Sequence, residues 1–507
     1  MRNKLKTLNT VFYYLGYLLV ILSVIILIPL IAVFIFQETK QGKHTFNAFL
    51  ISAVFSFGLG NFFRLIFKKG TPNTLQATFI CSLGWIIISA VGALPFVLGM
   101  DSSYLDAYFE TMSGFTTTGI TMFTGLDNFP KSILLWRALI QWIGGLGILT
   151  FFLAVFSKST GAHLLFGAES HKISSERPVP GLSNTVKILW YIYTGFTLLI
   201  IIMLYAAGSS LFDSICHSLT TLSTGGYSPY DASIGHYKLI GHSNYRLIEY
   251  ILIFGMFLGG TNFLMHYRLI RRDFKSVFKS TEMKFWLSFI FGFTLLIFIE
   301  RFVHFYLMKP INFLDLNFLK SVESGVRTTL FQVVSIITTT GFGTKDIGSP
   351  FFGYMAKQLF LIMMVIGGCV GSTGGGIKVL RIAILFKLIK REILRIFAPK
   401  SAVSHVIIDK NNLEPDEIYR VSSLFFIWIV FLVFGGLVTA FFSDLNSIQS
   451  FSGMFSALGN IGPSYIAVDK MTQLKPVIKI VYIFGMLAGR LEILPVLLLF
   501  SPKAWKY

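Results

Sequence analysis

Four short polar stretches, rich in threonine and glycine, interrupt a strongly apolar chain. Threonine and serine hydroxyls and closely presented backbone carbonyls are oxygen donors, and rings of carbonyls replace the hydration shell of potassium in ion filters. The stretches contain no acidic residue, which disfavours a selecting ring of carboxylates. Their chemistry predicts a cation path lined by backbone. The stretches are SGFTTTGIT (113–121), TTLSTGGYS (220–228), SIITTTGFGT (335–344) and SALGNIGPS (456–464).

Aligning the central glycines of the four stretches pairs Gly119, Gly225, Gly341 and Gly462. Glycine is the residue that most readily adopts unusual dihedrals and lets the backbone approach closely. The alternative for any one stretch is a helix-packing site inside a membrane, which four copies in matching contexts disfavour. The predicted lining is Thr117, Thr118 and Gly119; Ser223, Thr224 and Gly225; Thr339, Thr340 and Gly341; and Asn460, Ile461 and Gly462.

A second glycine-rich string follows the third polar stretch, inside the apolar segment LFLIMMVIGGCVGSTGGGIKVLRI. Each glycine in a helix interior costs about 1 kcal/mol relative to alanine, so a helix is predicted to break here. The string lacks the G-x-x-x-x-G-K-[ST] pattern and follows no strand, which disfavours a phosphate-binding loop. We interpret 368–376 as an intramembrane loop that blocks or opens the path, with passive helix packing as the alternative. The candidate gate residues are Gly371, Ser372, Thr373, Gly374, Gly375 and Gly376.

Arg490 lies at a matching depth near the fourth polar stretch, in GMLAGRLEIL. Charged residues inside membrane spans are costly and usually functional. Arg490 is expected either to donate to carbonyls of the interrupted loop or to repel cations until the loop moves. A purely structural pairing with the nearby Glu492 or with loop carbonyls is the alternative. By contrast, Glu249 and the Glu300–Arg301 pair lie near predicted span ends and are expected to be interfacial.

The composition places these residues in a membrane protein. Hydrophobic residues make up 54% of the 507 residues, charged residues only 13%, and the mean hydropathy is +0.70. Seven long apolar segments recur, and each reaches the roughly 20 residues that a helical span needs. These segments are Val11–Phe36, Phe46–Phe67, Ala77–Leu98, Ile188–Ala206, Phe285–Phe305, Val421–Phe442 and Pro476–Phe500.

The same order of elements surrounds each polar stretch: an apolar span, a short mixed segment, the polar stretch, a loop and a second apolar span. A dozen helical residues reach only about 18 Å, so the short segments cannot cross the bilayer and are expected to enter and return. Re-entrant backbone must be buried or line a cavity. The predicted fold is therefore an all-α polytopic membrane protein of ten spans, with four pseudo-symmetric helix–pore loop–helix repeats around a central pore. The predicted units are an N-terminal two-helix hairpin (1–70) and repeats at 71–160, 161–270, 271–400 and 401–507.

Charge alternates between the connecting segments. Segments 267–284 and 378–417 are rich in Lys and Arg, whereas 101–130 has neither. Basic loops face the cytoplasm by the positive-inside rule, which puts the N-terminus inside. This distribution also argues against nucleic acid as the partner of a chain with net charge +19. Four acidic residues are expected outside, where they would concentrate cations: Asp101, Asp106, Glu110 and Asp127.

Two cytoplasmic segments are predicted to meet other surfaces. The basic amphipathic stretch 377–397 is expected to be a helix on membrane lipid or against a partner, or an ordinary solvated face. The hydrophilic connector 398–417 is the best candidate docking loop. The scattered cysteines Cys81, Cys216 and Cys369 give neither a disulfide framework nor metal-ligand spacing.

Several motifs together resemble the Trk/Ktr/HKT superfamily of potassium transporters, closest to its TrkH/TrkG branch. They are FETMSGFTTTGIT, QWIGGLGI, AES followed by LWYIYTGFTLL, HSLTTLSTGGYSPYDASIG, GSTGGGIK and GRLEILPVL. The resemblance implies a homodimer with one pore per subunit, in the cytoplasmic (inner) membrane of a bacterium. It implies that the four aligned glycines mark a K⁺ filter and that residues 371–376 oppose Arg490 as a gate. It also implies a cytosolic TrkA-like ring that binds nucleotide.

Three classes of function compete. The first is gated, channel-like K⁺ uptake with no bound organic cofactor. The second is a symporter that couples K⁺ to H⁺ or Na⁺, but proton relays need buried acidic or histidine residues, and few occur within the predicted spans. The third is an intramembrane enzyme, for which no nucleophile–base pairing or H-E-x-x-H motif is present. The sequence favours the first.

Overall fold

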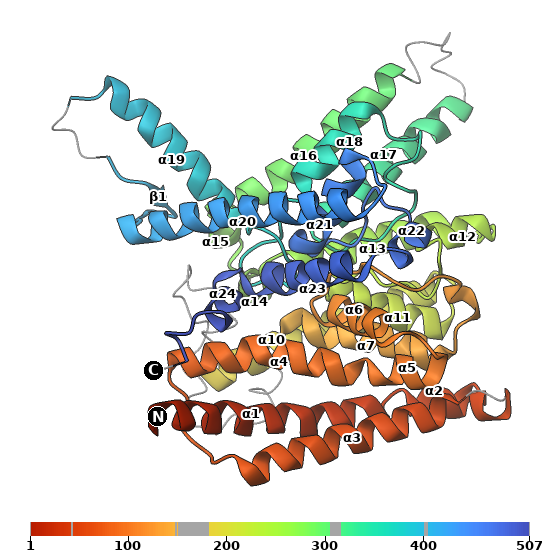
Figure 1. Cartoon of the computed structure of the whole chain (residues 1–507). Helices are drawn as coiled ribbons and strands as arrows, with labels where there is room; N and C mark the ends of the chain where they lie inside the picture. Colours follow the sequence, from red (N-terminus) through yellow and green to blue (C-terminus); the bar gives the residue numbers. More distant parts are fainter. Residues whose placement is uncertain are drawn as a thin grey trace.

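The computed structural model describes residues 2–41, 44–147, 150, 182–304, 316–399 and 404–505. Within these ranges the chain is almost entirely helical, apart from a small hairpin of β1 (Ile407–Ile408) and β2 (Asn411–Asn412). Long helices run side by side across the body, and both termini lie at one end (Figure 1). Six described helices are long and apolar enough to cross a membrane, or up to seven if one bent pair counts as a span. The chain is a helical, multi-pass membrane protein.

The N-terminal hairpin consists of α1 (Arg2–Leu27), α2 (Leu30–Ile35), η1 (Glu38–Gln41) and α3 (Thr45–Ile66). Two glycines let its long helices touch, because a Cβ placed on Gly16 would lie 2.6 Å from the carbonyl oxygen of Gly60. The hydroxyl of Ser56 also donates to the carbonyl of Leu19 across the pair. The hairpin packs on α4 along one edge of the body (Figure 1).

Four times along the chain, an outer helix is followed by an inner helix that ends at a polar stretch. Side-chain caps start three inner helices, with the hydroxyls of Ser103 and Ser210 and the amide of Asn446 accepting from backbone N–H groups. The outer helices are α4 (Thr74–Gly92) with α5 (Leu94–Met100), α10 (Leu182–Ala206), α16 (Thr281–Phe302) and α20 (Pro415–Phe442). The inner helices are α6 (Tyr104–Phe115), α11 (Leu211–Leu222), α17 (Leu316–Ile337) and α21 (Ser447–Gly459).

The third inner helix is longer than predicted. It begins at Leu316 rather than Val326. The additional turns carry Glu323, whose carboxylate pairs with Arg327 one turn later at 2.7 Å. Such an i,i+4 pair stabilises a helix, and the mixed composition of this segment hid that signal.

The helices after the polar stretches have bounds that differ from the predicted ones. These helices are α7 (Lys131–Leu146), α13 (Tyr245–Gly260), α18 (Tyr354–Met363) and α23 (Pro476–Leu491). The α13 helix bends by 103° into α14 (Phe263–Ile270), and α23 stops at Glu492 and Ile493, both at positive φ, before α24 (Leu494–Leu499). The predictions of uninterrupted helices over 248–264 and 476–500 are therefore wrong. In the span predicted over 133–156, residues 148–149 and 151–156 lie outside the described residues.

The predicted interruption of the third repeat is present. Residues 364–378, here called the glycine loop, separate α18 from α19 (Val379–Phe397). The α19 helix then leaves the body (Figure 1). Its exposed side includes Phe386, Ile389 and Phe397. The remaining elements are η2 (Leu126–Asn128), α12 (Gly235–Leu239), α15 (Phe274–Lys279) and α22 (Val468–Thr472).

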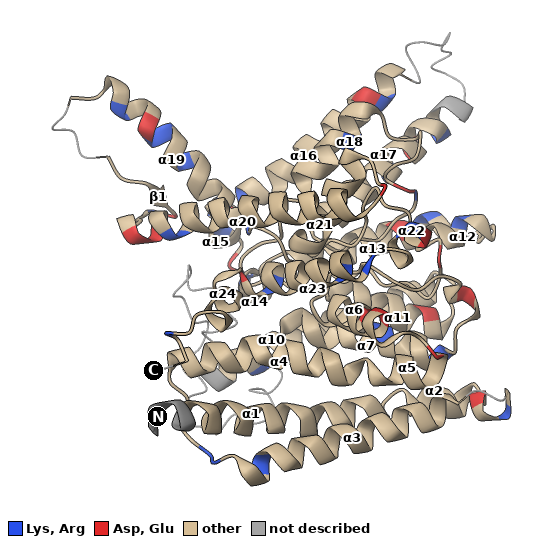
Figure 2. Cartoon of the chain, viewed as in Figure 1, with Lys and Arg blue, Asp and Glu red and all other residues tan. Residues whose placement is uncertain are grey.

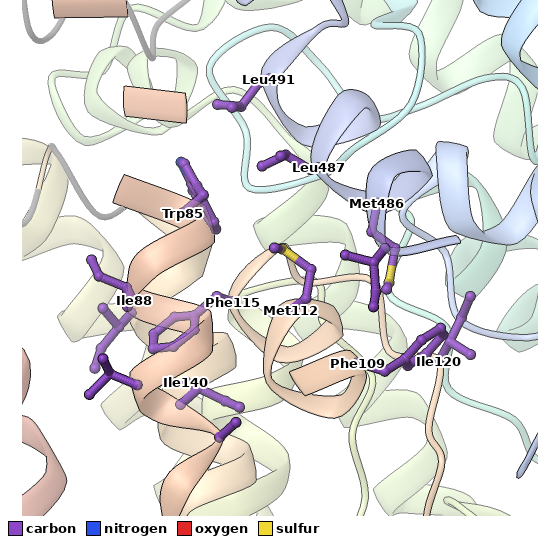
Figure 3. Packing of buried hydrophobic residues seen from close by; sticks show 14 of the residues in the cluster. Trp85, Ile88, Phe109, Met112, Phe115, Ile120, Ile140, Met486, Leu487 and Leu491 are labelled. Atoms are coloured by element: carbon purple, nitrogen blue, oxygen red, sulfur yellow. The ribbon is translucent and has the colours of Figure 1, made fainter. Parts of the chain in front are cut away.

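Apolar packing fixes the end of the first inner helix. Phe115, the last residue of α6, meets the ring of Trp136 edge-on, with ring centroids 6.5 Å apart. Trp85 and Ile88 of α4, Ile140 of α7 and Met486 of α23 belong to the same buried cluster (Figure 3). The first polar stretch, which continues from the end of α6, therefore leaves a residue that is fixed by packing.

Charged residues are sparse along the long helices and gather toward their ends, in the connecting segments and on α19 (Figure 2). This distribution leaves apolar middle sections on α1, α3, α4 and α20, as a helix that crosses lipid requires.

Candidate ion pathway

The four polar stretches form loops with one backbone pattern. In each loop a left-handed residue comes first, and a positive-φ glycine follows two residues later. The first positions have φ of 51–59°, and three of them hold threonine, a β-branched residue that is strained there. These pairs are Thr117 with Gly119, Thr224 with Gly226, Thr339 with Gly341, and Asn460 with Gly462. We call residues 116–119, 223–226, 338–341 and 459–462 polar loops 1 to 4.

Hydrogen bonds give the same register. In each loop, the N–H between the left-handed residue and the glycine donates to a carbonyl five residues earlier. The pairs are Thr118 N to Ser113 O (2.8 Å), Gly225 N to Thr220 O (2.9 Å), Thr340 N to Ser335 O (2.9 Å) and Ile461 N to Ser456 O (3.0 Å). The counterpart of Gly119 in loop 2 is therefore Gly226, so the sequence alignment on Gly225 was shifted by one residue. Two adjacent glycines made the sequence ambiguous, and Ser223 corresponds to Thr116 instead.

The four loops close into a ring. A Cβ placed on each positive-φ glycine would lie within 3.0 Å of a carbonyl oxygen of the next loop. The glycine–carbonyl pairs are Gly119 with Gly225, Gly226 with Thr340, Gly341 with Ile461, and Gly462 with Thr118. Because loop 4 returns to loop 1, the loops surround one axis in chain order. Both the dihedral and the lack of space exclude a side chain at these glycines.

A cavity of about 1000 Å³ opens on one side of this ring. All four positive-φ glycines line it, together with residues from the segments that follow the loops. Its charged lining residues are Arg137, Asp231, Lys238, Lys345 and Asp346. Burial and the nearby Lys238 and Arg301 lower the pKa of Lys345.

The acidic residues predicted to attract cations have other roles. Glu110 is fully buried and pairs with Arg137 at 2.9 Å. Asp106 pairs with Lys479 of α23 at 2.5 Å. Neither residue lines the cavity and both carboxylates are ion-paired, so the geometry does not support the expectation that these two concentrate cations. Sequence spacing gave no sign of Lys479, which lies 373 residues further along the chain.

Side chains of the inner helices fasten the segments that follow loops 1 and 2. The carboxylate of Glu110 accepts from the hydroxyl of Thr121 at 3.0 Å and from the N–H of Met122 at 2.8 Å. At the equivalent positions of the second repeat, the His217 ring nitrogen Nε2 lies 3.1 Å from the hydroxyl oxygen of Ser228. These contacts were missed from the sequence, although the correct register would have paired them.

Below the ring, on the side away from the cavity, the glycine loop contacts the left-handed residues. The N–H of Gly375 donates to the hydroxyl of Thr339 at 2.7 Å. The hydroxyl of Thr224 lies 3.1 Å from that of Thr373. A Cβ on Gly375 would lie 2.5 Å from the Cβ of Asn460. The predicted loop thus lies directly against loops 2, 3 and 4.

Arg490 supplies the contact to loop 1. Its guanidinium donates to the hydroxyl of Thr117 at 3.1 Å and to the carbonyl of Thr373 at 2.6 Å. It also donates to the carbonyls of Gly144 and Gly145, both at 2.6 Å. Arg490 therefore bonds to a carbonyl of the glycine loop, as one of the sequence hypotheses stated. One guanidinium thus joins loop 1, the glycine loop and the end of α7.

Residues around the glycine loop hold its shape. The ammonium group of Lys378 donates to the carbonyl of Gly374, and the N–H of Val370 donates to the carboxylate of Glu282 at 2.6 Å. Arg381 of α19 forms an ion pair with Glu492, the residue that ends α23. The N–H of Val379, the first residue of α19, donates to the carbonyl of Gly368 at 3.2 Å. The first turn of α19 is therefore tied both to the glycine loop and to the helix that carries Arg490.

Glu249, near the start of α13, is only 2% exposed and pairs with Arg327. The three cysteines are free and buried. The described part of the chain contains no group of three or more His, Cys, Asp or Glu residues able to hold a metal ion.

Comparison with known proteins identifies the family. The model of a family described as "TrkH: Cation transport protein" matches residues 41–507. The chain belongs to the TrkH family. The resemblance inferred from the motifs is confirmed, and membership of a transport family also confirms that the chain is not an enzyme.

TrkH family members resemble the chain over nearly its full length. The Trk system potassium uptake protein TrkH of Escherichia coli (strain K12) is 31% identical over 97% of this chain and 98% of its own. The Trk system potassium uptake protein TrkG of the same strain is 30% identical over 97% of each chain. The crystal structure of the potassium transporter TrkH from Vibrio parahaemolyticus matches with a TM-score of 0.84 and 28% identity, covering 98% of this chain and 99% of that one.

Proposed function

We propose that this TrkH family member takes up potassium through a gated, channel-like pore at the centre of the four polar loops. The closed ring of glycine–carbonyl contacts carries the proposal. The carbonyls of Thr118, Gly225, Thr340 and Ile461 come from four chain segments at one level, which is the arrangement that replaces an ion's hydration shell. The names of the similar proteins, potassium uptake proteins TrkH and TrkG, support K⁺ as the transported ion.

The inner helices favour a cation at this ring. Each of the four ends at its polar loop, so its C-terminal carbonyls face the region of the axis. A helix C-terminus carries a partial negative charge. The fourfold arrangement therefore adds four such ends without any carboxylate, and it also supports the predicted pseudo-symmetric repeats around a central pore.

The glycine loop and Arg490 are proposed as the gate. Arg490 places a positive charge beside loop 1, and its bond to the carbonyl of Thr373 ties that charge to the loop. A cation that leaves the ring would meet both a repelling charge and backbone in its path. Movement of residues 371–376 away from the loops would remove the block.

The setting of the transporter is also part of the proposal. We propose that the chain forms a homodimer in a bacterial cytoplasmic (inner) membrane, with the N-terminus in the cytoplasm. A cytosolic TrkA-like ring that binds nucleotide would act on the gate. The ties from α19 to the glycine loop and to Glu492 support a route for such an action, because they connect an exposed helix to the gate.

Uptake of ⁸⁶Rb⁺ into proteoliposomes tests both parts of the proposal. We expect uptake that K⁺ competes strongly and Na⁺ weakly, and a several-fold higher basal uptake when Gly371–Gly376 is deleted. The absence of K⁺-competed uptake would refute the transport function. Basal uptake that stays low after the deletion would refute the gate. A reversal potential that shifts with pH would favour H⁺-coupled symport over a channel.

A further inference from the structure

Polar loop 2 lacks a side chain where the other three have one. Its residue between the left-handed threonine and the positive-φ glycine is Gly225, whereas the equivalents are Thr118, Thr340 and Ile461. Gly225 is not among the glycines at positive φ, so its backbone conformation does not demand glycine. A Cβ on Gly225 would instead overlap the side-chain amide of Gln141. Gln141 occupies the space that a side chain has in the other loops.

Gln141 bonds to the backbone on both sides of the filter glycine of loop 2. Its side-chain N–H donates to the carbonyl of Gly225 at 2.6 Å, and its side-chain oxygen accepts from the N–H of Tyr227 at 3.0 Å. The side chain is fully buried. The orientation of the amide is dictated by these partners, because a flipped amide would face oxygen to oxygen and N–H to N–H.

A second side chain on the same face of α7 also bonds to the segment that follows loop 2. Arg137 lies one helical turn before Gln141, and its guanidinium donates to the carbonyl of Ser228 at 3.0 Å. The guanidinium also lies 4.1 Å from the centroid of the Tyr227 ring. A helix of the first repeat thus holds three backbone groups of the second repeat, one in loop 2 and two in the residues directly after it.

The positions equivalent to Gln141 in two other repeats are apolar. A Cβ on Gly144 would lie within 3.0 Å of the carbonyl two residues before the left-handed position of its own loop, and the same holds for Gly259 and Gly489. Three residues before these glycines stand Gln141, Met256 and Met486. Both methionines are fully buried. The only amide among the three positions therefore coincides with the loop that has Gly225.

We propose that Gln141 is a positioning residue that sets the ion specificity of the ring by fixing the carbonyl of Gly225. The proposal rests on the proposed potassium pathway. The carbonyl of Gly225 is one of the four in the ring, and it faces Gly119. The bond from Gln141 fixes the direction of this carbonyl and takes one of its two lone-pair sites. Without that bond the carbonyl can move toward the axis and coordinate a smaller ion, so discrimination against Na⁺ falls.

The test compares Gln141→Met with Met256→Leu in proteoliposomes. Gln141→Met places at this position the residue of the two equivalent positions, with similar volume and no amide. The readout is the ratio of Na⁺ to K⁺ concentrations that halve ⁸⁶Rb⁺ uptake, which does not depend on how much protein is inserted. Two lost hydrogen bonds predict that this ratio falls about tenfold. Met256→Leu, which changes a buried residue without such bonds, is expected to leave the ratio unchanged. An unchanged ratio in Gln141→Met would overturn the proposal.

A second pair of variants tests whether Gln141 occupies the space that a side chain at position 225 would fill. Gly225→Ala is expected to reduce uptake several-fold because its Cβ overlaps Gln141. The double variant Gly225→Ala with Gln141→Ala is expected to recover uptake, because the overlap is removed. Its discrimination against Na⁺ is expected to be poor, because no amide fixes the carbonyl of residue 225. Equal uptake by the single and double variants would contradict the overlap. Vesicles with the wild-type protein distinguish failure of the proposed function from failure of the role of Gln141. If these vesicles show no K⁺-competed uptake, the proposed function fails. If they transport, and the Na⁺ to K⁺ ratio of Gln141→Met equals that of the wild type, only the role of Gln141 is refuted.

Discussion

Polar loops 1 and 3 are fastened differently from loops 2 and 4. In loops 1 and 3, two threonine hydroxyls pair across the left-handed residue: Thr116 with Thr118 at 2.8 Å, and Thr338 with Thr340 at 2.7 Å. Loops 2 and 4 cannot make this pair, because Gly225 and Ile461 lack the hydroxyl. Amide side chains replace it. Gln141 reaches loop 2 from α7, and Asn460 donates from loop 4 to Thr118 at 2.8 Å and to the carbonyl of Met486 at 2.9 Å.

The difference teaches how a fourfold ring is built from unequal sequences. The backbone pattern is common to all four loops, whereas loops 1 and 3 contain a hydroxyl pair within the loop and loops 2 and 4 use an amide that joins the loop to another segment. A distant tie connects one repeat to the next, so its loss affects the ring as well as the loop. We therefore expect variants to rank by what they change: the shared backbone most, the distant amides next and the local hydroxyls least.

The largest effect is expected at the shared glycines, in both kinds of loop. Gly119→Ser and Gly226→Ser each force a side chain into the left-handed region, at about 1–3 kcal/mol, and against a carbonyl of the next loop. Discrimination between K⁺ and Na⁺ in the ⁸⁶Rb⁺ competition assay should fall at least about tenfold. Gly343→Ala is the control, because its Cβ meets only a carbonyl at 3.4 Å. Normal discrimination in Gly226→Ser would show that the structural register of loop 2 is wrong.

Much of this architecture follows from sequence pattern. The repeated order of elements predicted the inner helices and the glycine loop, because apolar length, glycine content and repetition are local signals. The register of loop 2 could not be predicted, since either Gly225 or Gly226 fits an alignment. The folded backbone decides between them, through the left-handed dihedral of Thr224, the positive φ of Gly226 and the hydrogen bond from the N–H of Gly225.

Contacts between residues far apart in the chain could not be predicted from the sequence either. The sequence contains Gln141 within QWIGGLGI, but nothing local indicates that it faces Gly225. The role of Asn460 was hidden for the same reason. The sequence LGNIG departs from the threonine-rich pattern of the other stretches, yet Asn460 adopts the same left-handed conformation, with φ of 53°. Asparagine tolerates this region better than threonine does.

An intermediate effect is expected from Asn460→Thr, which gives loop 4 the residue of the other three loops. The variant removes the N–H groups that reach Thr118 and Met486, and it puts a β-branched residue into the left-handed region. Two lost hydrogen bonds predict about tenfold weaker discrimination against Na⁺, as for Gln141→Met. Asn446→Ser, at the other end of α21, keeps a helix cap and serves as the control. Improved discrimination in Asn460→Thr would mean that threonine chemistry, rather than the distant tie, is what the ring requires.

The smallest effect is expected from Thr340→Val in loop 3. Valine keeps the shape of threonine, and the lost hydroxyl has a single described partner, Thr338. Thr338 keeps its other bond, in which its hydroxyl donates to the carbonyl of Val334 at 2.7 Å, so no buried donor is stranded. Discrimination against Na⁺ should fall by less than about threefold, against about tenfold for Gln141→Met in the same assay. Equal losses in the two variants would remove the distinction between local and distant fastening, because a hydroxyl pair within one loop would then matter as much as an amide that joins two repeats.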